Sequence, residues 1–363
     1  MSEKTILLNP GPTNVSQAVI DAAAGPLFCH REPEYFTLQD EVRERLVRVM
    51  DLDPEIWTAV LIAGSGTSAM ESMILAGVPA GKALLVSDNG VYGDRIVKMA
   101  KAHGIPVEVV TQPWTEATDP ALLAERCEQR DDLGALCVIH HETTTGLLNP
   151  VAEVGRVAKQ HGLNFLVDSV SGLAGDPLDF EAAGIDIVAG TGGKNYQGMP
   201  ALSFGYARRE KLEEARAWSP RSVYLDFVNL YDKQEHQGTP FTPAVPFVAA
   251  LRQALIELEE ETVAGRIARY AEAARFLRKG YRNIGLPLWL PEGTALSNCL
   301  TTIRLPAGRT YADLHDYLKE RGFVIYAGQG RIEAEAFRIA NMGNVEQADY
   351  QRLLDTLKAW VDA

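Results

Sequence analysis

Two ionisable residues each accompany an apolar run of strand length, and together they suggest chemistry at an amine. Asp168 lies near the end of NFLVDSV (164 to 170), and Lys194 lies twenty-six residues later in the glycine-rich TGGKNYQGMP (191 to 200). A charged side chain at the end of a buried strand costs free energy unless it is paired or neutralised. A lone aspartate there is as often a helix cap or a turn residue, so the two residues have to be judged together.

The lysine and the aspartate suit a cofactor that carries an aldehyde and a pyridine ring. An imine between Lys194 and the aldehyde removes the cost of a buried ammonium group, and it requires a lysine amine that can lose its proton. A carboxylate such as Asp168 beside the ring nitrogen keeps that nitrogen protonated. The ring can then take up electrons released at the α-carbon of a substrate.

A third element has the character of a phosphate site. The turn in AGSGTSAMESMILAG (63 to 77) follows an apolar run and leads into a helical pattern. At a helix N-terminus, Ser65, Gly66 and Thr67 offer backbone amides and hydroxyls to a phosphate dianion. The turn is a weak signal alone, and it is not a P-loop because no lysine follows the second glycine at the required place.

An alternation of strands and helices positions these residues. Apolar runs alternate with segments of helical periodicity, which predicts βαβ units and an α/β fold with a mainly parallel sheet. Ligands of such sheets bind beyond the carboxyl ends of the strands, where the residues above lie. The runs are 58–63, 83–87, 107–110, 135–140, 164–170 and 185–190.

The last third of the chain has a different pattern, and it predicts a small α+β domain. A long helix begins near residue 246, and short strands at 299–305 and 323–328 flank a further helix. The length of 363 residues exceeds one ordinary core. We predict an N-terminal arm over residues 1–20, a large cofactor-binding domain over 21–250 and a small C-terminal domain over 251–363.

The bulk composition favours small-molecule chemistry. The net charge is −13, and no Lys or Arg cluster stands apart from acidic residues, which argues against nucleic-acid and membrane partners. No apolar run approaches the roughly 20 residues that span a bilayer, and no signal peptide is recognised, so we expect a cytoplasmic protein. The four cysteines are scattered without CxxC spacing, so neither a metal site nor a disulfide framework is indicated. They are Cys29, Cys127, Cys137 and Cys299.

Motifs along nearly the whole chain resemble those of class V aminotransferases, which are pyridoxal 5'-phosphate enzymes of fold type I. The resemblance implies a large domain with a mainly parallel sheet of the seven-stranded type and a small C-terminal α+β domain. It also implies a small-molecule amino donor, a keto-acid acceptor and a homodimer with shared active sites. The motifs are LLNPGPTNV (7–15), GSGTSAMES (64–72), DNGVYGDR (88–95), HHETTTGLLNP (140–150), VDSVSGLAGDPLDF (167–180), TGGKNYQGMP (191–200) and FRIANMG (337–343).

The resemblance implies a set of cofactor contacts. By position, Lys194 carries the imine and Asp168 holds the ring nitrogen. Tyr92 stacks on the pyridine face, and Thr143 approaches the phenolic oxygen. Without the resemblance, Tyr92 is equally a half-buried loop aromatic and Thr143 a turn residue. The phosphate is assigned to the phosphate cradle, which consists of Ser65, Gly66 and Thr67.

Three further residues are implied for the partner subunit and the substrate. Thr242 corresponds to a residue that reaches the phosphate of the neighbouring subunit, and Arg338 to the arginine that holds the acidic group of the substrate. Arg31 lies near the substrate entrance of the family. By themselves, Thr242 is a residue of an extended segment, Arg338 is a strand-end arginine, and Arg31 is a surface partner for Glu32 or Glu34.

The lysine turn departs from the family at one position. Gly193 stands where relatives often carry a polar side chain that helps to bind phosphate. Backbone amides or the Thr191 hydroxyl are the two substitutes that the sequence offers.

The expected reaction is a transamination in two half reactions, in which the substrate amine displaces Lys194, which then acts as the base. The segment from FVIYAGQG (323–330) to FRIANMG resembles the branch that converts 2-aminoethylphosphonate and pyruvate into phosphonoacetaldehyde and alanine. Transaminases of the alanine:glyoxylate or serine:glyoxylate type are the alternative. A cysteine desulfurase needs a cysteine on a mobile loop near the site, and no cysteine follows Cys299. A cofactor-binding regulator would carry a DNA-binding segment, and no such segment is recognised.

Overall fold

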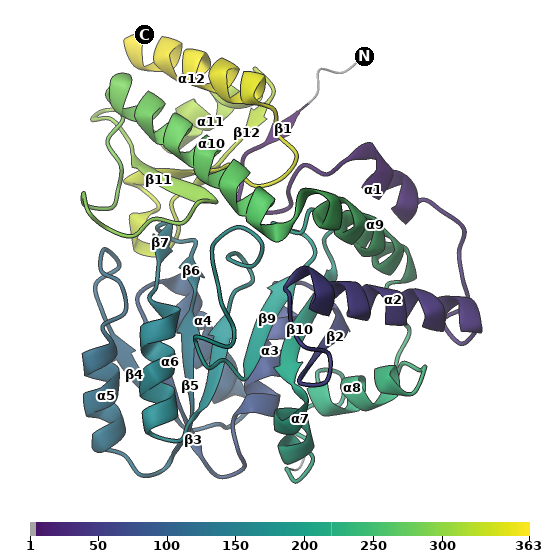
Figure 1. Ribbon diagram of the computed structural model, residues 1–363. Coiled ribbons are helices and arrows are strands. Elements are labelled where there is room, and N and C mark those ends of the chain that lie inside the picture. Colours follow the sequence, from purple (N-terminus) through teal and green to yellow (C-terminus); the bar gives the residue numbers. More distant parts are fainter. Residues whose placement is uncertain (1–4, 219) are drawn as a thin grey trace.

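One sheet of seven strands organises the larger region of the chain, in the order β2-β10-β9-β8-β5-β3-β4 (Figure 1). The computed structural model describes residues 5–218 and 220–363. β10 is antiparallel to both of its neighbours, and the other adjacent strands are parallel. The expected mainly parallel sheet is confirmed. Its strands are β2 (Trp57–Ala63), β3 (Ala83–Asp88), β4 (Val107–Thr111), β5 (Leu133–Ile139), β8 (Asn164–Asp168), β9 (Ile187–Thr191) and β10 (Leu202–Arg208).

Helices cover both faces of this sheet and bury an apolar core on each face. Because both faces are covered, most side chains of these strands are apolar on both faces, rather than apolar on one face and polar on the other. One core is formed with α2 (Pro33–Val49), α5 (Pro120–Glu128), α6 (Val151–Gln160) and α9 (Val245–Glu261). The other is formed with α3 (Gly66–Gly77), α4 (Val91–Ala102), α7 (Arg209–Ala215) and α8 (Phe227–Glu235).

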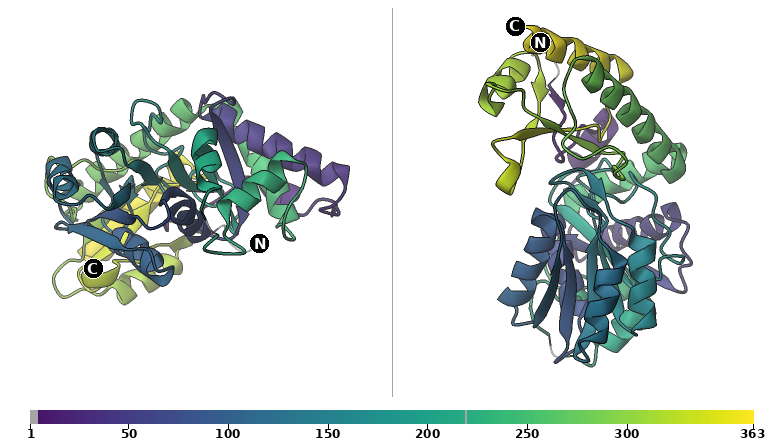
Figure 2. Two further views of the ribbon diagram at one scale, coloured as in Figure 1. Left: turned by 90° about the horizontal axis from the view of Figure 1, so that it is seen from below. Right: turned by 90° about the vertical axis from the view of Figure 1, so that its left-hand side faces the viewer.

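The smaller region lies against the edge of the large sheet where the parallel strands end (Figures 1 and 2). Its antiparallel sheet has the order β11-β14-β13 and packs with three helices around a third core. The small C-terminal domain that the sequence predicts is therefore confirmed. Its elements are β11 (Leu300–Arg304), β13 (Tyr326–Ala327), β14 (Ala336–Ala340), α10 (Val263–Asn283), α11 (Tyr311–Lys319) and α12 (Gln347–Asp362).

The beginning of the described chain also belongs to the smaller region. β1 (Ile6–Leu7) pairs in parallel with β12 (Phe323–Val324), and the side chain of Ile6 is buried in the same core as α12. After this strand the chain crosses to the larger region, where α1 (Gln17–Ala23) packs on α9. Residues 1–4 of the predicted arm lie outside the described residues, and the domain boundaries at 20 and 250 stay predictions.

The single long helix expected from residue 246 onward is wrong, because two helices meet at Thr262. This residue has a φ of 68°, in the left-handed region, and α9 ends there. A left-handed residue interrupts the helical hydrogen-bond ladder. The Thr262 hydroxyl then accepts the Gly265 N–H at 3.0 Å and begins α10.

The helices in the described part of the chain lack the combination of length and apolar character that a membrane crossing requires.

Candidate active site

Side chains that can bind a ligand or react with it lie together where the parallel strands of the large sheet end. Ser65 follows β2, Tyr92 follows β3, Asp168 ends β8 and Lys194 follows β9. Thr143 follows the short strand β6 (His141–Glu142), which comes directly after β5. Parallel strands present their carboxyl ends at one edge of a sheet, so the topology brings these positions to one place.

Asp168 is a buried carboxylate without an ion-pair partner among the described residues. It is 3% exposed, and its Oδ1 accepts the Val170 N–H at 3.0 Å. No lysine or arginine of the described residues forms an ion pair with it. Burial raises the pKa of Asp168, and the Val170 N–H and the positive charges of Lys194 and Arg95 oppose this rise. A cation that arrives next to this carboxylate is therefore stabilised.

Lys194 is half-buried, and its amine faces an aromatic ring. Nζ lies 5.9 Å from the centroid of the Tyr92 ring, and it makes no ion pair within the described residues. The N-terminal segment packs on the lysine: a Cβ at Gly11 would lie 3.3 Å from Lys194 Cγ, and the Thr13 hydroxyl donates to the Lys194 carbonyl at 3.3 Å. The stem and main chain are thus held, and the amine is left free to react.

The phosphate cradle begins helix α3. Ser65 is the N-cap residue, and its side chain makes no capping bond, so the first amides of the helix lack a side-chain acceptor and suit an anion. Gly66 packs on the loop after β8, where a Cβ would lie 2.5 Å from Val170 Cγ1. The close approach therefore requires glycine. Arg95 Nη1 donates to the Thr67 hydroxyl at 3.5 Å.

A buried carboxylate, Glu142, joins the start of α4 to the turn that carries Thr143. It accepts the N–H groups of Tyr92 at 3.2 Å and of Thr144 at 3.0 Å. It can approach the helix because Gly90 has no Cβ; one would lie 2.2 Å from Glu142 Cδ. Burial raises the pKa of Glu142 to about 7 in spite of these bonds. The Thr143 hydroxyl is buried and has no partner within the described residues, so it is available to a ligand.

Arg338 lies on β14 and reaches from the smaller region to the larger one. Its Nε donates to the Ala327 carbonyl at 2.9 Å, and its Nη1 donates at 3.0 Å both to the Thr143 carbonyl and to Gln329 Oε1. Nη2 has no acceptor among the described residues. Burial lowers the pKa of Arg338, and this desolvated cation favours an anionic partner.

Within the described residues, Thr242 and Arg31 form no hydrogen bond or ion pair with the residues of this site. Thr242 is exposed in the segment between α8 and α9, and Arg31 is exposed just before α2. Among the described residues, Arg31 also forms no ion pair with Glu32 or Glu34. The roles of Thr242 and Arg31 stay predictions.

Of the two substitutes at the lysine turn, the hydroxyl of Thr191 is already engaged. It donates to the Leu202 carbonyl at 3.2 Å. Gly193 itself is closely packed, since a Cβ there would lie 3.0 Å from the Cα of Pro200. A side chain that donates to a phosphate therefore has to come from outside positions 191 and 193.

Three residues of the site were missed by sequence reasoning, namely Arg95, Glu142 and Gln329. For Arg95 a signal existed, because it lies three residues after Tyr92 and so shares a helix face with it. Glu142 and Gln329 gave no signal, since their hydrogen-bond partners lie elsewhere in the chain and become neighbours only in the fold.

The side chains in this place fit pyridoxal phosphate. Buried Asp168 without a contacting cation suits a protonated ring nitrogen, and the unpartnered Thr143 hydroxyl suits a polar ring oxygen. The start of α3 suits a phosphate, and the amine of Lys194 suits an aldehyde. Each of these features is observed in the chain itself, so the residues of this site match the chemical groups of the cofactor.

A second cluster of polar side chains joins the two regions close by. His141, Asp176 and Cys299 are buried with donor atoms within 4.8 Å of one another, a spacing compatible with a metal ion. The Ser297 hydroxyl bridges them: it donates to Asp176 Oδ2 at 2.5 Å and lies 3.1 Å from His141 Nδ1. This hydroxyl gives hydrogen-bond partners to Asp176 and to His141 Nδ1, so the cluster acts as a link between the regions.

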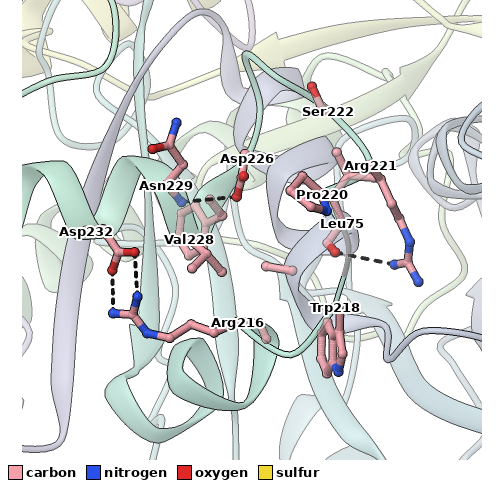
Figure 3. Close-up of a pocket in the computed structure, with 13 residues that line it drawn as sticks. Leu75, Arg216, Trp218, Pro220, Arg221, Ser222, Asp226, Val228, Asn229 and Asp232 are labelled. Carbon is pink, nitrogen blue, oxygen red and sulfur yellow. Dashed lines mark hydrogen bonds and ion pairs between the residues drawn. The ribbon is translucent and has the colours of Figure 1, made fainter.

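A cavity of about 280 Å³ lies at the opposite end of α3 from the phosphate cradle, between α3, α7 and α8 (Figure 3). Arg216 and Asp232 form an ion pair at its wall, and Arg221 donates to the Leu75 carbonyl at 3.4 Å. Its lining contains none of the residues described above. The chemistry is therefore at the strand ends and not in this cavity.

The family model for class V aminotransferases matches residues 6–334. The chain belongs to this family and is a pyridoxal-phosphate-dependent aminotransferase, which acts on an amino donor and a keto-acid acceptor. The family that the sequence motifs indicated is thereby confirmed.

Named relatives cover nearly the whole chain. A protein of Bacillus cytotoxicus is 36% identical, with 98% of each chain covered, and one of Syntrophobacter fumaroxidans is 38% identical, with 97% of this chain and 95% of the relative covered. Both are named 2-aminoethylphosphonate–pyruvate transaminase. The solved alanine–glyoxylate aminotransferase of Nostoc sp. has a TM-score of 0.92 and 27% identity, over 100% of this chain and 96% of that one.

Proposed function

We propose that this aminotransferase transfers the amino group of 2-aminoethylphosphonate to pyruvate, giving phosphonoacetaldehyde and alanine. The observation that carries the proposal is the buried Arg338 guanidinium, which retains an unbonded Nη2 beside the site. The two curated relatives bear the name of this reaction. The alternative is a transaminase of the alanine:glyoxylate or serine:glyoxylate type, and the likeness to the Nostoc enzyme supports it.

Lys194 and Asp168 are the proposed catalytic residues. Pyridoxal phosphate, when bound, supplies an aldehyde that condenses with amines and a ring that accepts electrons from the reacting carbon. Asp168 stabilises positive charge on the ring nitrogen, as its burial and its lack of a contacting cation suggest. The Lys194 amine, once free, would take the proton from the amine-bearing carbon of the donor and deliver it to the cofactor carbon that carried the aldehyde, and it would move a proton in the opposite direction for the keto-acid acceptor.

The remaining cofactor contacts follow from the free groups of the chain. The phosphate cradle offers the start of α3 to the phosphate, and the ring of Tyr92 covers one face of the pyridine. Thr143 donates its hydroxyl, which is otherwise unpartnered, to the phenolic oxygen. Glu142 keeps the main chain of Tyr92 in place.

Arg338 is the proposed anchor for the acidic group of the substrate. Three of its five N–H groups are bonded within the chain, two to main-chain carbonyls and one to the side chain of Gln329. A two-point contact with a phosphonate needs a parallel pair of donors. Gln329 is the partner of Arg338 that can move without displacing the main chain. When its side chain moves away, one N–H of Nη1 becomes free beside the N–H groups of Nη2, and the two nitrogens can bind a phosphonate together.

A homodimer with shared sites is proposed on the basis of two exposed features. Thr242 offers its hydroxyl to a neighbour, and Arg31 lies exposed next to an apolar segment. Leu27 and Val223 are 82% and 80% exposed, and large exposed apolar side chains suit burial in an interface. Thr242 then reaches the phosphate of the partner subunit, and Arg31 lies near the substrate entrance.

The cytoplasm is the proposed location. Cys29 is exposed and free, and Cys127, Cys137 and Cys299 are free and buried. Exposed free thiols persist in a reducing compartment.

The test compares amino donors in single turnovers of the holoenzyme, followed by the loss of the visible absorbance of the cofactor. We expect 2-aminoethylphosphonate to react far faster than alanine or serine at equal concentration. We also expect pyruvate to be a better acceptor than glyoxylate. 3-Aminopropanoate is the matched control, because it keeps the amine and the chain length and replaces the phosphonate by a carboxylate. If serine or alanine with glyoxylate is the better pair, the phosphonate assignment is wrong, while the family membership stands.

A further inference from the structure

Arg95 is a cation of the site to which neither the fold nor the proposed reaction has assigned a role. It lies on α4, one turn after Tyr92, and its guanidinium carbon is 4.5 Å from the centroid of the Tyr92 ring. It is half-buried and forms no ion pair within the described residues. An unpaired guanidinium at this depth is costly unless a ligand neutralises it.

The guanidinium of Arg95 also faces the phosphate cradle. Its Nη1 donates to the Thr67 hydroxyl at 3.5 Å, at the long end of a hydrogen bond. Among the described residues, no other lysine or arginine side chain forms a hydrogen bond with Ser65, Gly66 or Thr67. The Gly193 turn offers no side chain, and the Thr191 hydroxyl is bonded to a carbonyl. Arg95 is therefore the cation that is placed to meet an anion at the start of α3.

The charges of the site support an anionic ligand at this point. Lys194 and Arg95 are cations close to the buried carboxylate of Asp168, and both act on that carboxylate. The second buried carboxylate of the site, Glu142, accepts the backbone N–H groups of Tyr92 and Thr144 and pairs with neither cation. When the Lys194 amine is used in covalent chemistry, Arg95 remains as a positive charge. A phosphate dianion at the helix start is then balanced by this charge together with the helix dipole.

We propose that Arg95 is a cofactor-binding residue, whose guanidinium pairs with the phosphate of pyridoxal phosphate in the cradle and holds it against α3. This inference rests on the cradle proposed above. The competing role is structural, with Arg95 serving only to orient the ring of Tyr92. That role concerns the pyridine face and is independent of the phosphate.

The experiment measures the dissociation constants of the apoenzyme for pyridoxal phosphate and for pyridoxal, which has the same ring and aldehyde but no phosphate. We expect Arg95→Gln to weaken binding of pyridoxal phosphate by about 10- to 100-fold, the effect of a lost charge-assisted contact. Binding of pyridoxal should change less than about twofold, because its contacts remain. Arg95→Lys should recover part of the loss, since it keeps the charge. Lys98→Gln, which removes an exposed cation from the same helix, is the matched control and should change neither constant.

A second readout uses inorganic phosphate as a competitor of pyridoxal phosphate binding. It should compete in the wild type and in Lys98→Gln, and much less in Arg95→Gln. Equal weakening of both cofactor forms by Arg95→Gln, or no weakening at all, would overturn the proposal. If wild-type apoenzyme binds pyridoxal as tightly as pyridoxal phosphate, the cradle itself is misassigned and the failure lies with the proposed site.

Discussion

Asp168 and Lys194 belong to the ends of two adjacent strands of one sheet, whereas Arg338 belongs to a separate sheet in the smaller region. The first two are positioned by the register of β8 and β9, in which Asp168 pairs with Ala189. Arg338 instead reaches the larger region through the carbonyl of Thr143. The cofactor side therefore depends on a rigid sheet, and the substrate side depends on how two regions approach each other.

This difference means that chemistry and substrate choice are controlled by separate parts of the molecule. A change at β8 or β9 should affect the reaction with every donor. A change at β14 should affect donors according to their acidic group. Substitutions at Lys194, Asp168, Arg338 and Thr242 test this separation.

Lys194→Ala should have the largest effect. It removes both the amine that reacts with the cofactor and the base, so the turnover number should fall by about a thousandfold or more for every donor. The visible absorbance of the holoenzyme should change as well. Lys101→Ala, at an exposed lysine of α4, is the control and should retain full activity. Substantial turnover by Lys194→Ala would remove this residue from the mechanism.

Asp168→Asn should reduce the turnover number by about a hundredfold or more while the phosphate contacts remain. The amide no longer stabilises a charged ring nitrogen, and loss of one partner of a buried charge pair costs about 3 to 5 kcal/mol. Steady-state kinetics with two donors, together with a titration of cofactor binding, separates the two effects. Near-normal turnover would contradict the role of this carboxylate.

Arg338→Ala should lower kcat/KM for 2-aminoethylphosphonate by about one to two powers of ten, because a charge-assisted contact contributes roughly 2 to 3 kcal/mol. For a simple amine without an acidic group, the same substitution should have little effect. Equal losses for both amines would show that Arg338 acts on the site as a whole, and the separation of the two sides would then fail.

Thr242→Ala should have the smallest effect, a weakening of cofactor binding by about 5- to 10-fold from one lost hydrogen bond. Its diagnostic value lies in mixing experiments with Lys194→Ala chains at limiting cofactor. In a mixed dimer one site regains both residues, so random mixing should restore about a quarter of the wild-type activity. Subunit exchange has to be demonstrated first. If activity does not recover in the exchanged mixture, Thr242 belongs to the site of its own subunit or to no site.

The parts of the fold that sequence patterns predicted are those in which local composition agrees with the tertiary position. β8 and β9 are continuous apolar runs between turn residues, and the chemistry follows their ends. β10 was missed, because Ser203 and Gly205 interrupt its apolar character and it directly follows the lysine turn. Its small residues are explained only by the structure, in which a Cβ at Gly205 would lie 2.7 Å from the ring of Phe227.

The site shows the same division between local and distant information. Lys194 and Asp168 could be found because glycine-rich turns and strand ends are visible in the sequence. The bond between Gln329 and Arg338 depends on the fold of β13 and β14, and the partner of Thr242 lies outside the chain. The break at Thr262 was hidden in a helical pattern, since a threonine in the left-handed region has no compositional signature.

The pairing of β1 with β12 also sets an order of events during synthesis. Ile6 emerges from the ribosome early, but its partner Phe323 is made more than three hundred residues later. At roughly 5 to 20 residues per second the delay is about 15 to 60 seconds. Until then the segment that packs on Lys194 through Gly11 and Thr13 has no strand to anchor it. The lysine is consequently enclosed only when translation is nearly finished. We expect binding of the cofactor in its final geometry to be a late step in the folding of the new chain.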